Sequence, residues 1–140
     1  MVEKARAFGF RRYWFDRVSI SSGHYDRFAQ VRLGFDIKAS YVVKESKVTI
    51  SFRVKVFSGE KADYFCAATC FGEFRFKDVS RKEDIPDYFY SNSIAILFPY
   101  LRAFVSLLTM QANFGEAVVL PLLNFTSVGK TIKDRMSVID

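Results

Sequence analysis

The stretch of sequence that decides the fold is residues 88–110, YFYSNSIAILFPYLRAFVSLLTM. Its apolar residues recur at helical spacing, which predicts one long helix with an apolar stripe. The stripe consists of Ile94, Leu97, Phe98, Leu101, Val105 and Leu108. Pro99 stands near the middle and should bend this helix, because proline lacks the amide hydrogen that the helix needs. Arg102 lies close by, and an arginine at a bilayer centre costs about 2.5–3.5 kcal/mol. We therefore expect a packed helix and no integral membrane segment.

The residues upstream of this helix are predicted to form strands. Every second residue from Val48 to Val56 is apolar, which is the clearest strand pattern in the chain. Residues 31–37 alternate in the same way, and residues 8–22 and 64–76 are predicted as the first and fourth strands. Short connections between successive strands predict an antiparallel sheet with one face exposed to water.

Downstream of the long helix, residues 117–125 form a short apolar segment and residues 126–136 a second, weaker helix. The predicted fold class is therefore α+β, a four-stranded antiparallel sheet packed with one long helix and a shorter C-terminal helix. The length of 140 residues suits one domain, so residues 1–140 are assigned to a single domain. One helix covers at most one face of a sheet, so we expect the remaining apolar surface to close by oligomerisation.

Phenylalanine and positive charge are the two excesses of the composition. The chain has 16 Phe against 1 Trp, and its 21 Lys and Arg against 15 Asp and Glu give a formal net charge of +6. So much Phe predicts that some aromatic side chains meet a partner. The charge lies in the predicted sheet, since residues 1–38 carry eight basic and four acidic groups while the helical half is neutral. Nucleic acid, anionic lipid and acidic peptide are all partners that suit such a surface.

The sequence offers little for catalysis or metal binding. The only histidine is His24, in a predicted loop, and Asp84 and Asp87 lack a partner histidine or a second carboxylate pair. We therefore expect no enzyme activity, no catalytic residues, no cofactor and no metal site.

The two cysteines are predicted to be free, buried thiols. Cys66 and Cys70 are four residues apart in a predicted strand, which would separate their Cα atoms by about 13 Å, too far for a disulfide. Free thiols favour a reducing compartment. Residues 1–10 also lack a sustained apolar run, so we expect a cytoplasmic protein.

Two segments resemble the SecB family, bacterial chaperones that hold secretory precursors unfolded. Residues 95–102, AILFPYLR, resemble the family signature (N/A)-I-L-F-P-Y-x-R, and residues 120–125, LPLLNF, resemble its second motif. Tyr64-Phe65-Cys66 and the Gly72-x-Phe74 pattern resemble its fourth strand, so the resemblance covers about residues 8–130. The helix motif is the specific part, because proline inside a helix is unusual.

The resemblance implies an ATP-independent holdase that binds hydrophobic segments of unfolded proteins or preproteins. Its role would be protein export or control of a toxin–antitoxin pair, with an antitoxin among the candidate clients. The implied assembly is a homotetramer built as a dimer of dimers. The cargo-binding residues predicted on this basis are Phe28, Val31, Leu33, Phe35, Tyr64, Phe71 and Phe125. The predicted subunit interface comprises Tyr13, Phe15, Phe98, Leu101, Val105 and Leu108.

The sequence leaves several of these assignments open. The apolar face of residues 31–37 suits a sheet core as well as a groove, and Tyr64 and Phe71 suit either environment equally. The long-helix stripe also suits the core of a single chain.

The chain departs from the family where carboxylates grip the basic tail of the SecA motor. The corresponding positions hold Arg17, Ser21 and Ala67, none of which is acidic. A cationic patch should repel that tail. The chain therefore resembles a divergent, solitary or toxin–antitoxin-associated member, and standard SecA docking is not expected.

An alternative function is suggested by the N-terminal strand. Arg11, Arg12 and Arg17 lie close to Tyr13 and Trp14, a combination that suits a basic RNA- or anionic-surface-binding module. A solvated strand face is the simpler interpretation, because no recognised RNA-binding motif accompanies these residues. Nucleic-acid binding should weaken steeply with salt, whereas binding in apolar grooves should persist.

Overall fold

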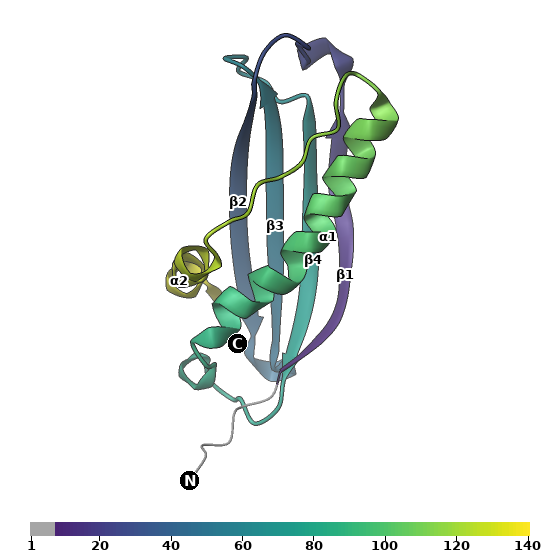
Figure 1. Cartoon of the computed structure of the whole chain (residues 1–140). Helices are drawn as coiled ribbons and strands as arrows, with labels where there is room; N and C mark the ends of the chain where they lie inside the picture. The colour runs from purple at the N-terminus through teal and green to yellow at the C-terminus, as the bar shows by residue number, and fades with distance from the viewer. Residues whose placement is uncertain (1–7) are drawn as a thin grey trace.

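The computed structural model describes residues 8–140, so the prediction about residues 1–10 lies mostly outside it. The elements in chain order are β1 (Phe8–Ile20), β2 (Val31–Val42), β3 (Lys47–Ser58), β4 (Cys66–Phe76), α1 (Tyr88–Ala112), α2 (Phe125–Arg135) and β5 (Ser137–Ile139). Short 3₁₀ turns lie at Ser22–His24, Val43–Glu45 and Lys82–Asp84. Figure 1 shows α1 lying diagonally across one face of the sheet, with residues 113–124 returning across the same face to α2.

The sheet has five strands in the order β1-β4-β3-β2-β5. The four long strands pair antiparallel, as predicted, whereas β5 pairs parallel with residues 40–42 of β2. The predicted α+β class is confirmed, but the prediction of a purely antiparallel four-stranded sheet is wrong. The fifth strand has only three residues, which is too short to show an alternating pattern in the sequence.

The hydrophobic core lies between this sheet and α1. The alternating residues of β3 from Val48 to Val56 are fully buried on the helix-covered face. Leu97 of α1 packs over β4 at Gly72, where an added Cβ would lie 2.6 Å from Leu97 Cδ2. Glycine is therefore required at this position for the helix to approach the sheet so closely.

Helix α1 continues through Pro99 without interruption. Proline cannot donate to the carbonyl of Ala95, and both residues are exposed, so water can satisfy that carbonyl. By length and composition alone α1 could cross a bilayer. Nine of its residues are buried in this fold, however, as in the core helix of a folded domain.

Both cysteines are free and buried, as predicted. Burial raises the pKa of the Cys66 thiol to about 11 and that of Cys70 to about 12. Because the thiolate is the reactive form, both residues are inert at neutral pH.

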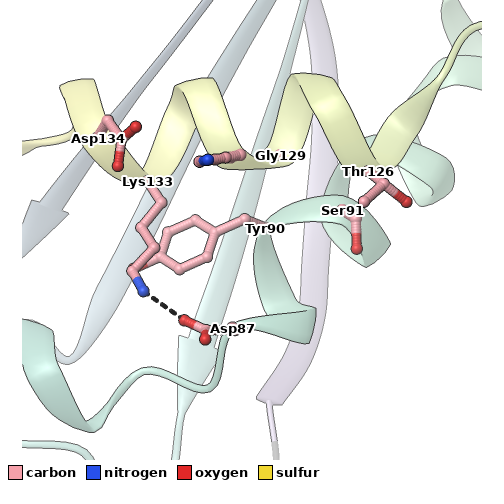
Figure 2. Close-up of a pocket in the computed structure, with 8 residues that line it drawn as sticks. Asp87, Tyr90, Ser91, Thr126, Gly129, Lys133 and Asp134 are labelled. Carbon is pink, nitrogen blue, oxygen red and sulfur yellow. Dashed lines mark hydrogen bonds and ion pairs between the residues drawn. The ribbon is translucent and has the colours of Figure 1, made fainter.

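Helix α2 crosses the start of α1 at very short range. An added Cβ on Gly129 would lie 2.7 Å from the backbone nitrogen of Ser91. Beside the crossing, Lys133 of α2 donates a hydrogen bond to the carboxylate of Asp87 (Figure 2). That hydrogen bond raises the pKa of Lys133. Because Gly129 has no side chain, α2 and α1 can pack this closely at the crossing.

We expect Gly129→Ala to lower the free energy of unfolding by about 1–3 kcal/mol through overpacking. Alanine would otherwise stabilise the helix by about 1 kcal/mol relative to glycine. A decrease in the free energy of unfolding would therefore show that the added Cβ is too close to α1. Urea unfolding followed by circular dichroism measures the change. The matched control is Gly34→Ala, whose added Cβ meets its nearest side-chain atom at an ordinary 3.6 Å. Equal stability of Gly129→Ala and wild type would contradict the close crossing.

Candidate functional site

Exposed apolar side chains gather along residues 113–124, the segment between α1 and α2, which we call the linker. Leu122 is 81% exposed and Val119 is 60% exposed. Between them, Leu120 is fully buried and fixes the segment to the core. The linker thus presents apolar side chains to water while its position on the sheet is held.

One hollow, of about 710 Å³, lies between the linker and the first half of β2. We call it the β2-side hollow. Its wall on the sheet side includes Tyr25, Val31 and Leu33, and its wall on the linker side is residues 114–119. The volume is within the range of about 300–1,000 Å³ that is typical of ligand-binding pockets.

A second hollow, of about 360 Å³, lies between the linker and the outer face of α1. We call it the α1-side hollow. Its lining residues are Ala95, Phe98, Pro99, Arg102, Ala103, Ser106, Leu122 and Phe125. Val119 lines the β2-side hollow and Leu122 the α1-side hollow. The linker therefore separates two neighbouring hollows and contributes an exposed apolar side chain to each.

Two side chains of α1 hold the linker in place. The hydroxyl of Thr109 accepts a hydrogen bond from the backbone amide of Val118 at 2.9 Å and donates to the carbonyl of Val105 at 2.8 Å. The hydroxyl of Ser106 donates to the carbonyl of Val118 at 2.9 Å. Both backbone groups of one linker residue are thus satisfied by α1, and this contact positions the wall between the hollows.

An aromatic contact closes the end of the β2-side hollow. The ring of Tyr25 packs against Phe114 and Phe65, with centroids 5.3 Å and 4.9 Å away. Gly115 lies so close to this ring that an added Cβ would collide with the Tyr25 hydroxyl. A side chain at this position would have to displace the Tyr25 ring from the end of the hollow.

Only some of the predicted cargo residues lie at the two hollows. Val31 and Leu33 line the β2-side hollow, and Phe125 lines the α1-side hollow. Phe28, which is 87% exposed, lies on the loop that supplies other residues of the β2-side hollow. Phe35 is half-buried, with its ring 5.9 Å from the core ring of Phe52.

Tyr64 and Phe71 lie apart from both hollows. Phe71 pairs with Ser51 and Trp14, which alternate away from the helix-covered face, and Tyr64 contacts Phe57 on that same side. The sequence prediction also omitted Val119 and Leu122. The sequence signals for them were the apolar run of residues 117–125 and, for Leu122, the resemblance of residues 120–125 to the second family motif.

Three of the predicted interface residues are core residues of this chain. Phe98, Leu101 and Val105 are 3%, 0% and 0% exposed, because the stripe of α1 packs on its own sheet. Leu108 is half-buried against the same core. Phe98, Leu101 and Val105 therefore have almost no surface left for a second subunit.

Tyr13 and Phe15 lie on β1, at the edge of the sheet. The ring of Tyr13 stacks on Tyr100 of α1 at 4.0 Å, and that of Phe15 stacks on Phe104 at 4.1 Å. Tyr13 remains 43% exposed. Among residues 8–140, no strand pairs with the outer side of β1. We call this strand and its stacked rings the β1 edge.

The positions considered for catalysis do not converge. His24 lies 4.0 Å from Asp63 on the surface, and Asp84 pairs with Arg81 at 3.6 Å. Within residues 8–140, no group of three His, Cys, Asp or Glu residues could hold a metal ion. A further cavity of about 320 Å³ lies between α1 and α2, next to the Lys133–Asp87 hydrogen bond (Figure 2).

Comparison with known proteins gives three findings. The SecB family model, described as preprotein translocase subunit SecB, matches residues 21–133. An uncharacterised protein of Methanocaldococcus jannaschii is 27% identical over 114 residues, which span 78% of this chain and 72% of that protein. Among solved structures, the SecB-like chaperone of Mycobacterium tuberculosis, in complex with a ChAD peptide from the HigA1 antitoxin, matches with a TM-score of 0.65 and 18% identity. That match covers 84% of this chain and 88% of the mycobacterial one.

We expect Thr109→Val to release the linker. The variant keeps the shape of the side chain but leaves the Val118 amide without a partner, which should cost about 1–3 kcal/mol of unfolding free energy. Hydrogen exchange of the amides in residues 113–124 should accelerate, whereas exchange in β3 should not. The matched control is Ser106→Ala, which frees only a carbonyl and should have the smaller effect. Unchanged exchange in the linker of Thr109→Val would show that other contacts hold it.

Proposed function

The chain belongs to the SecB family, and we propose that it is an ATP-independent holdase for unfolded polypeptides. The observation that carries this proposal is the set of exposed apolar side chains around the two hollows. Leu122, Val119 and Phe28 are 81%, 60% and 87% exposed. Large side chains with this exposure do not stabilise the chain's own core. They offer apolar contact area to a partner whose sequence need not be fixed.

A client would lie along the linker in this proposal. The exposed side chains of the linker alternate with the buried Leu120, so a bound peptide would meet an apolar ridge with a hollow on each side. On such a surface, affinity would come from the apolar contact area that is buried and not from the shape of a single pocket. No nucleotide or cofactor is needed, and release would occur by dissociation.

An antitoxin-type segment is one class of client that we propose. The mycobacterial structural relative was solved with a peptide from an antitoxin, which supports this class alongside secretory precursors. Delivery to SecA is not part of the proposal, because Arg17, Ser21 and Ala67 supply no acidic group. Unfolded chains are encountered where proteins are made, so we place this activity in the cytoplasm.

We also propose that the protein assembles with further copies of itself, starting at the β1 edge. The 13-residue strand β1 leaves one side of its backbone unpaired in this chain. An edge strand of that length is normally covered or paired. The exposed faces of Tyr13 and Tyr100 extend the same surface onto α1. Pairing of β1 with β1 of a second copy would give a dimer, and two dimers would give a homotetramer.

The holdase proposal predicts that the purified protein suppresses aggregation of a refolding substrate at a stoichiometric ratio without nucleotide. Leu122→Ser should weaken binding of a labelled unfolded client about tenfold, because one large apolar contact is lost. Light scattering and fluorescence anisotropy measure the two effects. The matched control is Ile139→Ser, which removes a 50%-exposed apolar side chain on β5.

Two outcomes would contradict this proposal. One is the absence of suppression at several-fold excess of the intact protein. The other is equal weakening by Leu122→Ser and Ile139→Ser, which would mean that binding does not depend on the linker.

The assembly proposal predicts a solution mass that is an even multiple of the chain mass. Tyr13→Lys places a charge on the β1 edge and should shift the protein to monomers. Light scattering coupled to size-exclusion chromatography measures the mass. Val138→Lys on β5, at the opposite edge of the sheet, should leave it unchanged. A wild-type monomer, or dissociation by both variants alike, would reject the β1 edge as the interface.

A further inference from the structure

The face of the sheet turned away from α1, which we call the open face, is strongly basic. Strand register and side-chain alternation assign seven basic and three acidic residues to it. The basic residues are Arg12, Arg32, Lys38, Lys47, Arg53, Lys55 and Arg75, and the acidic residues are Asp16, Asp36 and Glu73. Most of the chain's net positive charge therefore lies on one surface.

The few carboxylates of the open face do not neutralise its cations. Glu73 alone is shared by three cations, since Arg12, Lys47 and Arg75 lie 3.9 Å, 3.7 Å and 3.9 Å from it. Arg32, Arg53 and Lys55 take part in no ion pair within residues 8–140. The centre of the open face is therefore a region of unbalanced positive charge.

Arg53 is the most unusual member of this group. It is only 8% exposed, and its Nη1 donates to the carbonyl of Arg17 at 3.1 Å and to the hydroxyl of Thr69 at 2.8 Å. Its Nε is buried and has no hydrogen-bond partner. Asp36 lies opposite Arg53 in the strand register, but it pairs with Lys38 at 3.7 Å and Arg53 forms no ion pair in the described part of the chain. A buried charge that forms no ion pair is costly for a folded chain. An anion above this site would offset that cost.

Aromatic rings are interleaved with these cations. The rings of Trp14 and Phe71 stack with centroids 5.3 Å apart, and the guanidinium of Arg12 lies 4.5 Å from the Trp14 ring. The guanidinium of Arg32 lies 4.3 Å from the Phe57 ring. Tyr64 has Lys55 Nζ 5.3 Å and the Arg53 guanidinium 5.8 Å from its ring centroid. Four aromatic side chains and their cations thus lie on the face that α1 does not cover.

We propose that the open face binds single-stranded nucleic acid. The cations would pair with backbone phosphates, and the bases would stack on the rings and on the planar guanidinium groups. An acidic peptide would engage the cations but would leave the rings unused, and a double helix hides its bases. A single strand is the partner that uses both features.

This second surface is separate from the holdase site. The linker crosses the helix-covered face of the sheet (Figure 1), and linker residues line both hollows. The holdase site and the open face are therefore on opposite sides of the sheet. The core of the protein lies between the two surfaces, so client and nucleic acid could be bound together. Failure of one proposal leaves the other standing.

Trp14 is the only tryptophan in the chain and lies on the open face, so its fluorescence tests the proposal without a label. We expect an oligouridylate of about 20 nucleotides to quench Trp14 in the full-length protein. A slope of about −2 is expected for the logarithm of affinity against the logarithm of salt, since each phosphate contact in a single strand contributes about −0.7. An unfolded client peptide should leave Trp14 fluorescence unchanged.

Charge-matched variants identify the surface. Combining Arg12→Gln, Lys55→Gln and Arg75→Gln should weaken oligouridylate binding at least about tenfold and flatten the salt slope. Combining Lys44→Gln, Lys77→Gln and Lys130→Gln removes the same charge from exposed sites off the open face. This control variant should weaken oligouridylate binding less than about threefold. Because these variants retain Trp14, fluorescence and circular dichroism confirm that each is folded.

A further variant separates a nucleic acid from other anions. Phe71→Leu removes a ring and keeps an apolar side chain, so it should weaken oligouridylate binding several-fold while poly-glutamate binding is unaffected. The proposal is overturned if oligouridylate does not bind, or if both triple variants lose affinity equally. It is also overturned if poly-glutamate or anionic phosphatidylserine vesicles bind as tightly as the oligouridylate, since the open face would then be specific only for negative charge.

Discussion

The packing of α1 across one face of the sheet is the interaction on which the rest of the structure depends. Its stripe from Ile94 to Val105 is buried against β3 and β4, and Gly72 lets Leu97 reach the sheet backbone. A single helix lying diagonally cannot cover a sheet of this width (Figure 1). The remaining part of that face is crossed once by the linker, which fills it incompletely. The hollows on either side of the linker therefore exist because α1 and the linker together cover only part of this face of the sheet.

The small number of helices and strands also explains why the β1 edge and the open face are exposed. A second layer of helices would have buried the open face, and a further strand would have paired with the outer side of β1. Neither is present among residues 8–140. The chain is left with three surfaces of different chemistry: an apolar linker, an aromatic edge and a basic sheet face. Each has the chemistry of a different type of partner, and the three proposals above follow from that difference.

Periodicity in the sequence predicted the long helix, the four long strands and the buried cysteines, because each of these depends on neighbours in the chain. It did not reveal β5, whose three residues form a strand only because β2 offers a free edge. It also could not distinguish core from surface for aromatic residues of equal hydrophobicity. Phe98 and Phe28 have the same side chain, yet one is 3% and the other 87% exposed, since only one of them faces the sheet. The exposed linker residues were missed for the same reason.

The positive charge illustrates how tertiary structure turns composition into a specific surface. In the sequence, Arg53 is one polar residue in an alternating strand. In the fold it reaches across β4 to the carbonyl of Arg17, where β1 is distorted by a residue with a φ of 54°. A β-bulge leaves backbone groups outside the ladder, and a long cationic side chain from two strands away satisfies one of them. The distortion of the edge strand thus draws an arginine into a buried position on the open face. Because that arginine forms no ion pair within residues 8–140, the geometry of a backbone irregularity adds an unbalanced positive charge to this face.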